Sequence, residues 1–422
     1  MTDDPSVRRS TRAVLAIGIL VGLVLAVETA LSTPEQVGLA STVYYYAGEA
    51  ILAGENVYTV TPPDYDGYNY LYPPIVVLAF LPHALLGSQT AAFALQTILN
   101  VAAGTGIAIV VWRGLARRGV SLERVDYALV LGFTLLSSHA ITQVIQGQVT
   151  LWLAFLLAAG FDALERERER EREREAVAGA AFALAALVKL FPAVIGLWLL
   201  RRRAWRGVAA AVATGCGGLL AGLVLFGPDL TIQYVTEVLT GRFRESTFDG
   251  VPDPDRSLVT VRRLFAALGV GPTLLTPLAL ATLAPFVAAL YRRVDTDERR
   301  LAALLGTLVA TLLFMPLQPL YFSLLAFPLL VLLYRLPAGR SRHLLVAGVY
   351  CTYAMFSLEM VVVAVGVVPL PAGLEAAVLS VAETVFTAIL PPTVGMWLLL
   401  FACVSICYDG EMAAHRVPSP AD

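Results

Sequence analysis

The amino-acid sequence predicts an all-α polytopic membrane protein. The 422-residue chain is 58% hydrophobic and only 15% charged, whereas soluble domains carry about 25% charged residues. Its mean hydropathy is +0.73. The apolar runs are about 20 residues long, the length of a membrane-crossing helix and unlike the short alternating strands of an outer-membrane barrel. We expect one integral membrane domain, 1–422, with about 10–12 transmembrane or half-membrane helices.

The distribution of arginine predicts the orientation of these helices. A first helix is expected at 13–32, and three arginines precede it, namely Arg8, Arg9 and Arg12. The polar loop 33–72 that follows contains no Lys or Arg. Because basic residues favour cytoplasmic loops, we expect a cytoplasmic N-terminus, an external loop at 33–72 and a plasma-membrane location. The net charge of −2 gives no reason to expect a nucleic acid partner.

The remaining apolar segments give the order of the later elements. Residues 73–113 divide near Gly87, and helices at 125–145 and 149–164 form a hairpin with an external tip. A run of alternating Glu and Arg, 165–175, predicts a solvated cytoplasmic linker. After 176–200 we expect an external loop at 227–257 and a polar tail at 408–422. The helices in this part of the chain are expected at 207–226, 261–268, 272–291, 301–316, 320–334, 344–367 and 371–407. The last of these is expected to be broken at 391–392.

Lys189 is the only lysine of the chain, and it lies inside an apolar segment. A lysine near the bilayer centre costs about 2.5–3.5 kcal/mol on insertion scales, so it is expected to face protein, water or an anion. Basic clusters flank 176–200 on both sides, yet this segment is too short for two full crossings. Two alternatives follow: a broken hairpin of two half-helices that meet at 189–192, or one crossing kinked at Pro192.

The external loop 33–72 is rich in tyrosine, with eight of the 16 tyrosines between 44 and 72. Residues 40–53 fit an amphipathic helix that Gly54 ends. Tyrosine suits a membrane interface, and its ring and hydroxyl also bind sugars, so both interpretations stay open. The carboxylates of the loop are candidates for a general base. They are Glu35, Glu49, Glu55, Asp64 and Asp66.

The external loop 227–257 carries arginines on a face that otherwise lacks them, which indicates an anionic partner. Arg244 and Arg256 are the two that we single out. The four cysteines all fall in apolar segments, which indicates buried thiols and no metal site. They are Cys216, Cys351, Cys403 and Cys407.

Four motifs follow one another along the chain. They are Tyr44-x-x-Ala-x-x-Ala-x-Leu-x-Gly54-x-x-x-Tyr58 with Tyr72-Pro-Pro, Gly147-Gln-Val-Thr-Leu, Gly179-x-x-x-x-x-Ala-Ala-x-x-Lys189-x-x-Pro192 with an Arg cluster after it, and Pro316 with the helix after it. In order and spacing, over roughly 13–335, they resemble the motifs of glycosyltransferase family 87, the DUF2029-type membrane proteins.

The resemblance implies a GT-C fold and a reaction at the external face of the membrane. A polyprenyl-phosphate sugar, commonly mannose, is the donor, and a lipid or glycan is the acceptor. An aspartate deprotonates the acceptor hydroxyl, the anomeric carbon is attacked with inversion, and polyprenyl phosphate leaves. No further cofactor is implied. The residues expected to contact donor or substrate are Lys189, Gln148, Tyr44, Tyr72, Arg244, Arg256 and Tyr321, with the other arginines of 242–263 as alternatives to Lys189.

The sequence departs from the family pattern at two positions. Ala40 stands where the aspartate is expected, and Tyr321 stands where the late motif often carries a histidine. Three alternatives follow: Glu49, Asp64 or Asp66 supplies the base, the substrate has changed, or the protein is inactive and only binds the lipid-linked sugar. A transporter or lipid flippase is the rival from another class, because those folds also contain broken helices and intramembrane charges.

Overall fold

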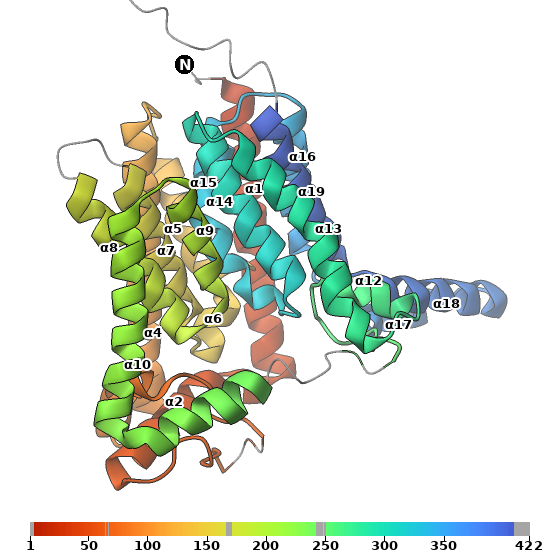
Figure 1. Cartoon of the computed structure of the whole chain (residues 1–422). Helices are drawn as coiled ribbons and strands as arrows, with labels where there is room; N and C mark the ends of the chain where they lie inside the picture. The colour runs from red at the N-terminus through yellow and green to blue at the C-terminus, as the bar shows by residue number, and fades with distance from the viewer. Residues whose placement is uncertain are drawn as a thin grey trace, which may run out of the picture. The chain divides into compact units, whose positions relative to one another are not determined.

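The structure is a computed structural model that describes residues 4–63, 65, 67–165, 171–241, 248 and 250–408. Within these ranges the chain is built from helices, and the extended backbone pairs only at an isolated antiparallel bridge between Val259 and Leu317. The predicted all-α class is confirmed. Figure 1 traces the chain from its N-terminal to its C-terminal helices.

The chain divides into two compact units. The first is made of 9–249 and 318–330, and the second of 2–8, 250–317 and 331–422. Two helices, α1 (Pro5–Ser32) and α15 (Ala326–Arg335), run from one unit into the other. Each unit is described here by itself.

Five helices of the described chain are long and apolar enough to cross a membrane. They are α1, α4 (Gln89–Arg117), the helix Trp205–Leu239, α13 (Pro272–Arg292) and α19 (Pro391–Tyr408). Shorter apolar helices occupy Pro74–Leu85, Phe191–Arg201 and Pro319–Arg335. The prediction of a polytopic membrane protein is confirmed, while the larger number of full and half crossings stays a prediction.

Besides α4 and most of α1, the first unit contains the following helices. They are α2 (Leu39–Ala53), α3 (Leu81–Leu85), α5 (Arg124–Leu136), α6 (Ile141–Gln146), α7 (Thr150–Glu165), α8 (Glu171–Val188), α9 (Gly196–Arg201) and α10 (Trp205–Gln233), with 3-10 helices at Pro34–Gln36, Pro74–Phe80, Phe191–Ile195 and Pro319–Leu325. The division near Gly87 is confirmed, because the Ser88 side chain caps α4. The helix expected at 125–145 is broken into α5 and α6.

The chain around Lys189 forms a hairpin. Helices α8 and α10 pack along each other in the same direction, because Gly207 lies against Glu175 and Gly179 while Gly218 lies against Leu187. The segment between them must therefore run back along α8, and it does so as the 3-10 helix Phe191–Ile195 followed by α9. The broken hairpin is thus the correct alternative, and the single kinked crossing is wrong.

Helix α10 changes direction near its end. Gly227 has φ +84°, a backbone conformation that glycine adopts readily, and Pro228 follows it. The chain then continues as helix to Gln233 and as a π-helix from Tyr234 to Leu239. The loop expected from residue 227 therefore begins with a helix, which the sequence analysis missed.

The second unit is assembled from helices of the C-terminal half. They are α12 (Val261–Ala267), α13, α14 (Asp297–Phe314), α16 (Arg340–Tyr353), α17 (Leu358–Val367), α18 (Ala372–Ala388) and α19. Helices α16 and α17 meet at an angle of 75°, so the single helix expected at 344–367 is wrong. The break expected at 391–392 is confirmed, since α18 ends at Ala388 and α19 begins at Pro391.

Arg263 is the most buried charged side chain of this unit, with none of its surface exposed. Its guanidinium donates hydrogen bonds to three backbone carbonyl groups, those of Asp253, Arg256 and Phe386, at 2.6–3.0 Å. Arginine suits this position because it has five donors in a fixed plane. Arg263 therefore ties the turn at 253–256 to the end of α18.

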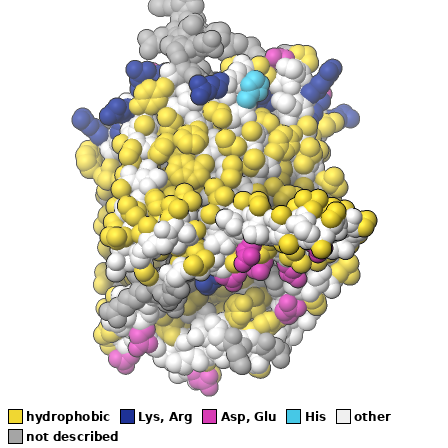
Figure 2. Space-filling model, turned by 90° about the vertical axis from the view of Figure 1, so that its right-hand side faces the viewer, with side chains coloured by type: hydrophobic (Ala, Val, Ile, Leu, Met, Phe, Trp, Pro, Cys, Tyr) yellow, Lys and Arg dark blue, Asp and Glu magenta, His cyan; other side chains and the backbone are white. Residues whose placement is uncertain are grey.

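The surface has the character of a membrane protein. Figure 2 shows hydrophobic side chains over most of the face turned to the viewer, with Lys and Arg gathered mainly along the upper edge. Of the four cysteines, Cys403 and Cys407 are buried, as expected, whereas Cys216 is exposed and Cys351 is partly exposed. For Cys216 the expectation of a buried thiol is wrong, because it lies on α10, whose surface is largely exposed.

Candidate active site

Helix α2 carries the first tyrosines of the candidate site into the interior of the first unit. The predicted C-cap is confirmed, because Gly54 has φ +75° and its N–H reaches back to the last turn. The ring of Tyr44 stacks on Phe80 with centroids 4.1 Å apart, and its hydroxyl lies 2.9 Å from that of Tyr72. Tyr44 and Tyr72 are only 3% and 7% exposed, so they pack within protein and do not form a belt at the membrane surface.

Gln148 joins this tyrosine pair to the turn between α6 and α7. Its side-chain oxygen accepts a hydrogen bond from Tyr44 at 3.3 Å. The preceding Gly147 has φ +67°, and a Cβ there would lie 2.8 Å from that of Ser41 on α2. Glycine therefore permits both the backbone turn and the close approach of α2. Because the Tyr44 hydroxyl donates its hydrogen bond to Gln148, its oxygen can accept one from the Tyr72 hydroxyl.

Lys189 lies at the tip of the hairpin and points to the same region. Its ammonium donates to the Tyr321 hydroxyl at 3.1 Å and to the Thr150 hydroxyl at 3.4 Å. It also lies 4.5 Å from the centroid of the Tyr321 ring, which is within cation–π distance. Tyr321 belongs to the 3-10 helix Pro319–Leu325, which Gln143 holds by donating to the carbonyl group of Leu320.

These contacts bring five predicted residues into one place. Thr150 begins α7 two residues after Gln148, so the Lys189 contacts and the Tyr44 contacts share one turn of chain. Burial raises the pKa of the Tyr44 hydroxyl well above its usual range, and the nearby Tyr72 and Tyr321 add to the effect. The five residues are Lys189, Gln148, Tyr44, Tyr72 and Tyr321.

A second set of polar side chains forms hydrogen bonds next to these five residues. The sequence analysis did not identify this second set. Gln96 donates to the carbonyl group of Gln148 at 3.3 Å, and its side-chain oxygen lies 3.0 Å from the Nε2 of His83. Gln96, His83 and Thr150 are fully buried. The sequence feature that could have identified them is their polarity within apolar segments. A polar group at membrane depth is costly and is retained for binding or for structure.

The other predicted residues lie elsewhere or outside the described chain. Glu49 follows Tyr44 by five positions on α2, about 140° around the helix, so the two side chains leave it in different directions. There it accepts a hydrogen bond from Tyr45 at 2.7 Å, which raises the pKa of Tyr45 to about 12. Ala40 is a buried residue of α2. Asp64, Asp66 and Arg244 lie outside the described residues.

Arg256 lies in the second unit. It is an exposed residue of the turn 253–256, and its backbone carbonyl group accepts a hydrogen bond from Arg263 at 2.7 Å. Arg262, one of the alternatives to Lys189, places its guanidinium 4.7 Å from the centroid of the Phe314 ring. The Arg263 guanidinium donates its hydrogen bonds to backbone carbonyl groups, so it stabilises the fold of this turn.

The group around Lys189 has the chemistry of an anion site. An ammonium and several hydroxyl groups converge there, and all of them can donate to the oxygens of a phosphate. Such donors are held in place before a ligand arrives, so they stabilise developing charge without rearrangement. The aromatic rings beside them offer flat apolar surfaces to a sugar ring.

Comparison with known proteins gives one match. The family model of glycosyltransferase family 87 matches residues 70–316, which is more than half of the chain. The matched range includes Tyr72, Gln148 and Lys189, while α2 and Tyr321 lie outside it. Neither the search of curated proteins nor that of solved structures gave a match. The chain belongs to glycosyltransferase family 87 and is a multi-pass membrane glycosyltransferase.

Proposed function

We propose that the protein transfers a hexose, most simply mannose, from a polyprenyl-phosphate donor to a lipid or glycan acceptor, with inversion at the anomeric carbon. The observation that carries this proposal is the convergence of Lys189 with Tyr321 and Thr150 beside the Tyr44–Tyr72 pair. A cation next to aromatic walls fits a ligand with a phosphate at one end and a sugar beside it.

The first role is the stabilisation of the leaving group. As the bond between the anomeric carbon and the phosphate oxygen breaks, negative charge grows on the polyprenyl phosphate. Lys189 and the Tyr321 hydroxyl are placed to meet that charge, and groups of this kind contribute about 100-fold to 1000-fold to turnover in other enzymes. Arg244 and Arg256 remain candidates for contact with the donor phosphate.

The second role is the activation of the acceptor. A carboxylate takes the proton of the acceptor hydroxyl, and the oxygen forms the new glycosidic bond while polyprenyl phosphate departs. Glu49, Asp64 and Asp66 are the candidates, because Ala40 occupies the position of the family's usual aspartate.

The site would face the outside of a plasma membrane. Lys189 contacts Thr150 at the start of α7, whereas Glu165 at the end of α7 pairs with Arg202. Arg202, and Arg117, which pairs with Asp162 three residues earlier, therefore lie toward the opposite end of α7 from Lys189. Because basic loops favour the cytoplasm, this separation supports a cytoplasmic N-terminus and an external site.

The test is transfer of labelled hexose by the purified full chain. Polyprenyl-phosphate mannose and glucose would be compared as donors, with wild type, Lys189→Met, Glu49→Gln, Asp64→Asn and Asp66→Asn. Loss of the general base should lower turnover by about 100-fold to 10,000-fold, and only one of the three carboxylates should show this loss. Tyr68→Phe is the matched control, because Tyr68 is 52% exposed on the same loop.

Several outcomes would contradict the proposal. Lipid binding without transfer from either donor would indicate an inactive binding protein. Transfer that proceeds equally well in Lys189→Met would remove the phosphate role of the lysine. Movement of labelled lipid across a vesicle membrane without any new glycosidic bond would indicate a flippase.

A further inference from the structure

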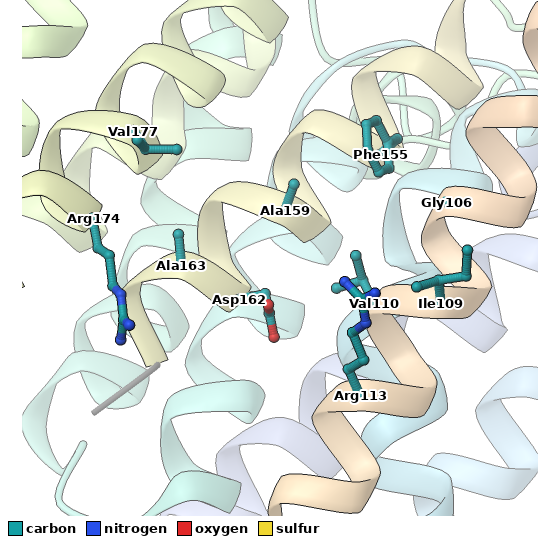
Figure 3. Close-up of a pocket in the computed structure, with 10 residues that line it drawn as sticks. All are labelled: Gly106, Ile109, Val110, Arg113, Phe155, Ala159, Asp162, Ala163, Arg174 and Val177. Atoms are coloured by element: carbon teal, nitrogen blue, oxygen red, sulfur yellow. The ribbon is translucent and has the colours of Figure 1, made fainter. Parts of the chain in front are cut away.

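Two features of the described chain are built from residues that the candidate active site does not use. The first is a cavity of about 500 Å³ between α4, α7 and α8, and Figure 3 shows side chains that line it. Its buried carboxylate, Asp162, forms an ion pair with Arg117, so the charge of Asp162 is balanced within the protein. The second is the pair of packed helices α17 and α18 in the second unit, which we call the C-terminal hairpin, 358–388. Its aliphatic side chains are largely exposed, and this indicates a partner.

The C-terminal hairpin begins and ends at the same end of two packed helices, α16 and α19. Near one end of this pair, the hydroxyl oxygens of Ser341 and Ser405 lie 2.8 Å apart. Near the other end, a Cβ on Gly395 would lie 2.7 Å from the backbone nitrogen of Thr352. Helices α16 and α19 therefore run antiparallel, and the hairpin connects the end of α16 to the start of α19.

The helices of the hairpin run across the direction of that pair. Helix α17 meets α16 at an angle of 75°, and Figure 1 shows α17 and α18 crossing the direction of α16 and α19. With 10 residues, α17 is about 15 Å long, which is half the thickness of the hydrocarbon core. Because α19 is long and apolar enough to cross the membrane, a hairpin in this orientation runs along the membrane surface.

Hydrogen bonds hold both ends of the hairpin at its base. The N–H of Glu359, in the first turn of α17, donates to the carboxylate of Asp255 at 3.3 Å. The carbonyl group of Phe386, in the last turn of α18, accepts a hydrogen bond from Arg263 at 2.6 Å. Phe386 is the only buried residue of these two helices, which the structure describes throughout. The base of the hairpin is therefore fixed to the second unit, while the rest of its surface is exposed.

Helix α18 has an apolar face and a polar face. Its exposed aliphatic side chains follow one another at spacings of four, three and four residues, which places them on one side of the helix. They are Leu374, Val378, Val381 and Val385, and each is 36–63% exposed. Ser380, Glu383 and Thr387 lie on the other side. A helix with an exposed apolar face and a polar face opposite is suited to the boundary between acyl chains and head groups.

We propose that the C-terminal hairpin binds the surface of the lipid bilayer, with the apolar face of α18 against the acyl chains and Glu383 toward the water. Helix α17 adds Val363 and Val367, which are 63% and 80% exposed. Contact of these side chains with water is unfavourable in proportion to their apolar area, and the acyl chains remove that contact. The hairpin then determines how deeply the second unit sits in the membrane.

The charges of the hairpin indicate which lipid surface it meets. Residues 343–415 contain no Lys or Arg, whereas Arg340 and Arg342 lie at the start of α16. Because basic residues favour the cytoplasmic side, this supports an external position for the hairpin. The hairpin carries three glutamates and no basic residue, so its binding depends on the apolar face and gains nothing from anionic head groups.

The experiment measures the membrane depth of nitroxide labels on single cysteines of the full chain in phosphatidylcholine vesicles. Cys216 and Cys351, which are exposed and partly exposed, are first replaced by serine, and this background without a new cysteine is the blank. Val378→Cys and Val381→Cys report the apolar face of α18, and Ser380→Cys is the matched control on its polar face. Relaxation by oxygen, which dissolves in hydrocarbon, is compared with relaxation by a water-soluble nickel complex.

We expect the two faces to differ. Labels on the apolar face should be relaxed by oxygen and lie about 5–10 Å below the head groups, while the label at Ser380 should be relaxed by nickel. Leu280, 57% exposed near the middle of α13, supplies a reference close to the bilayer centre, about 15 Å deep. In a second measurement, Val381→Asp should raise nickel access to a label at Val385, and Ser380→Asp should leave it unchanged.

Four results would overturn the proposal. Labels on the apolar face that lie as deep as the one at Leu280 would make the hairpin a membrane-crossing or re-entrant element. Equal nickel access on both faces would place the hairpin in water. Low access to both reagents, with spin–spin broadening between molecules, would mean that a second copy of the chain covers the apolar face. An unchanged label at Val385 in Val381→Asp would show that the aliphatic row does not hold the hairpin in the membrane.

Discussion

The Nζ of Lys189 lies 3.1 Å from the hydroxyl oxygen of Tyr321 and 4.5 Å from the centroid of the same ring. The only lysine of the chain is thus held by a hydrogen bond and a cation–π contact to one residue. The sequence resemblance implied a lysine and often a histidine at these two positions. Tyr321 keeps the ability to donate a hydrogen bond, and it adds an aromatic face for the ammonium.

The first prediction concerns the hydroxyl group of Tyr321. Tyr321→Phe keeps the ring under the ammonium and removes the hydroxyl, so donor affinity should fall about 10-fold to 100-fold, the value of a hydrogen bond to a charged group. Tyr321→His should recover most of this loss, because an imidazole can also donate. Binding of the labelled donor to both variants is the measurement. If Tyr321→Phe binds like wild type, the hydroxyl does not contact the donor.

The second prediction concerns the packing of α8 on α10. A Cβ on Gly179 would lie 1.9 Å from the carbonyl oxygen of Gly207, which is backbone and cannot move aside. Gly179→Ala should therefore lower the free energy of unfolding by about 1–3 kcal/mol. Gly215→Ala on α10 has open space around it and should be neutral or stabilising by about 0.5–1 kcal/mol. Unfolding in detergent compares the two, and equal effects would contradict this account of the hairpin.

The third prediction concerns the buried guanidinium of Arg263. Arg263→Met leaves three buried carbonyl groups without their donors, so the free energy of unfolding should fall by about 3 kcal/mol or more. Arg263→Lys keeps the charge but lacks the planar fork, and it should recover only part of the loss. Arg340→Gln, at an exposed position, should change the free energy of unfolding by less than about 0.5 kcal/mol.

The fourth prediction concerns pH. The hydrogen bond to Glu49 raises the pKa of Tyr45 to about 12, above its value of about 10 in an unfolded chain. The folded state therefore favours the protonated hydroxyl, and this contribution is complete below pH 10 and is lost as the pH rises through 12. Ultraviolet titration of wild type against Tyr45→Phe should show a tyrosine with this raised pKa. In Glu49→Gln it should return toward 10, and an unchanged value would assign the shift to another group.

The fold class could be predicted from the hydropathy of the sequence, because a bilayer requires long apolar helices. Gly54 as a C-cap was predicted because glycine readily adopts the left-handed conformation that ends a helix, and the break before Pro391 was predicted because proline restricts the backbone. The bend between α16 and α17 was missed because neither residue type occurs at 354–357; the signal present there was Ser357, whose side chain caps α17. The helix after Gly227 was missed because glycine followed by proline is typical of a loop.

Part of the candidate site could also be predicted from the sequence, because a charge in an apolar segment is easily recognised. A lone lysine in an apolar segment is costly and therefore conspicuous, and the motif spacing indicated Gln148, Tyr44 and Tyr321 beside it. His83 and Gln96 were not found, because a neutral polar residue costs far less in an apolar segment than a charge. Whether the Glu49 side chain points toward Lys189 depends on which face of α2 is turned to the lysine. The sequence alone does not show which face that is.

The hairpin at Lys189 also bears on how the protein enters its membrane. Because the segment between Glu175 and Ala204 leaves and returns to the same end of α10, it adds an even number of passages through the bilayer, whatever depth its tip reaches. Insertion of this segment during biosynthesis therefore cannot invert the helices that follow it. A change in the depth that the tip reaches should therefore leave the side of each downstream loop unaltered.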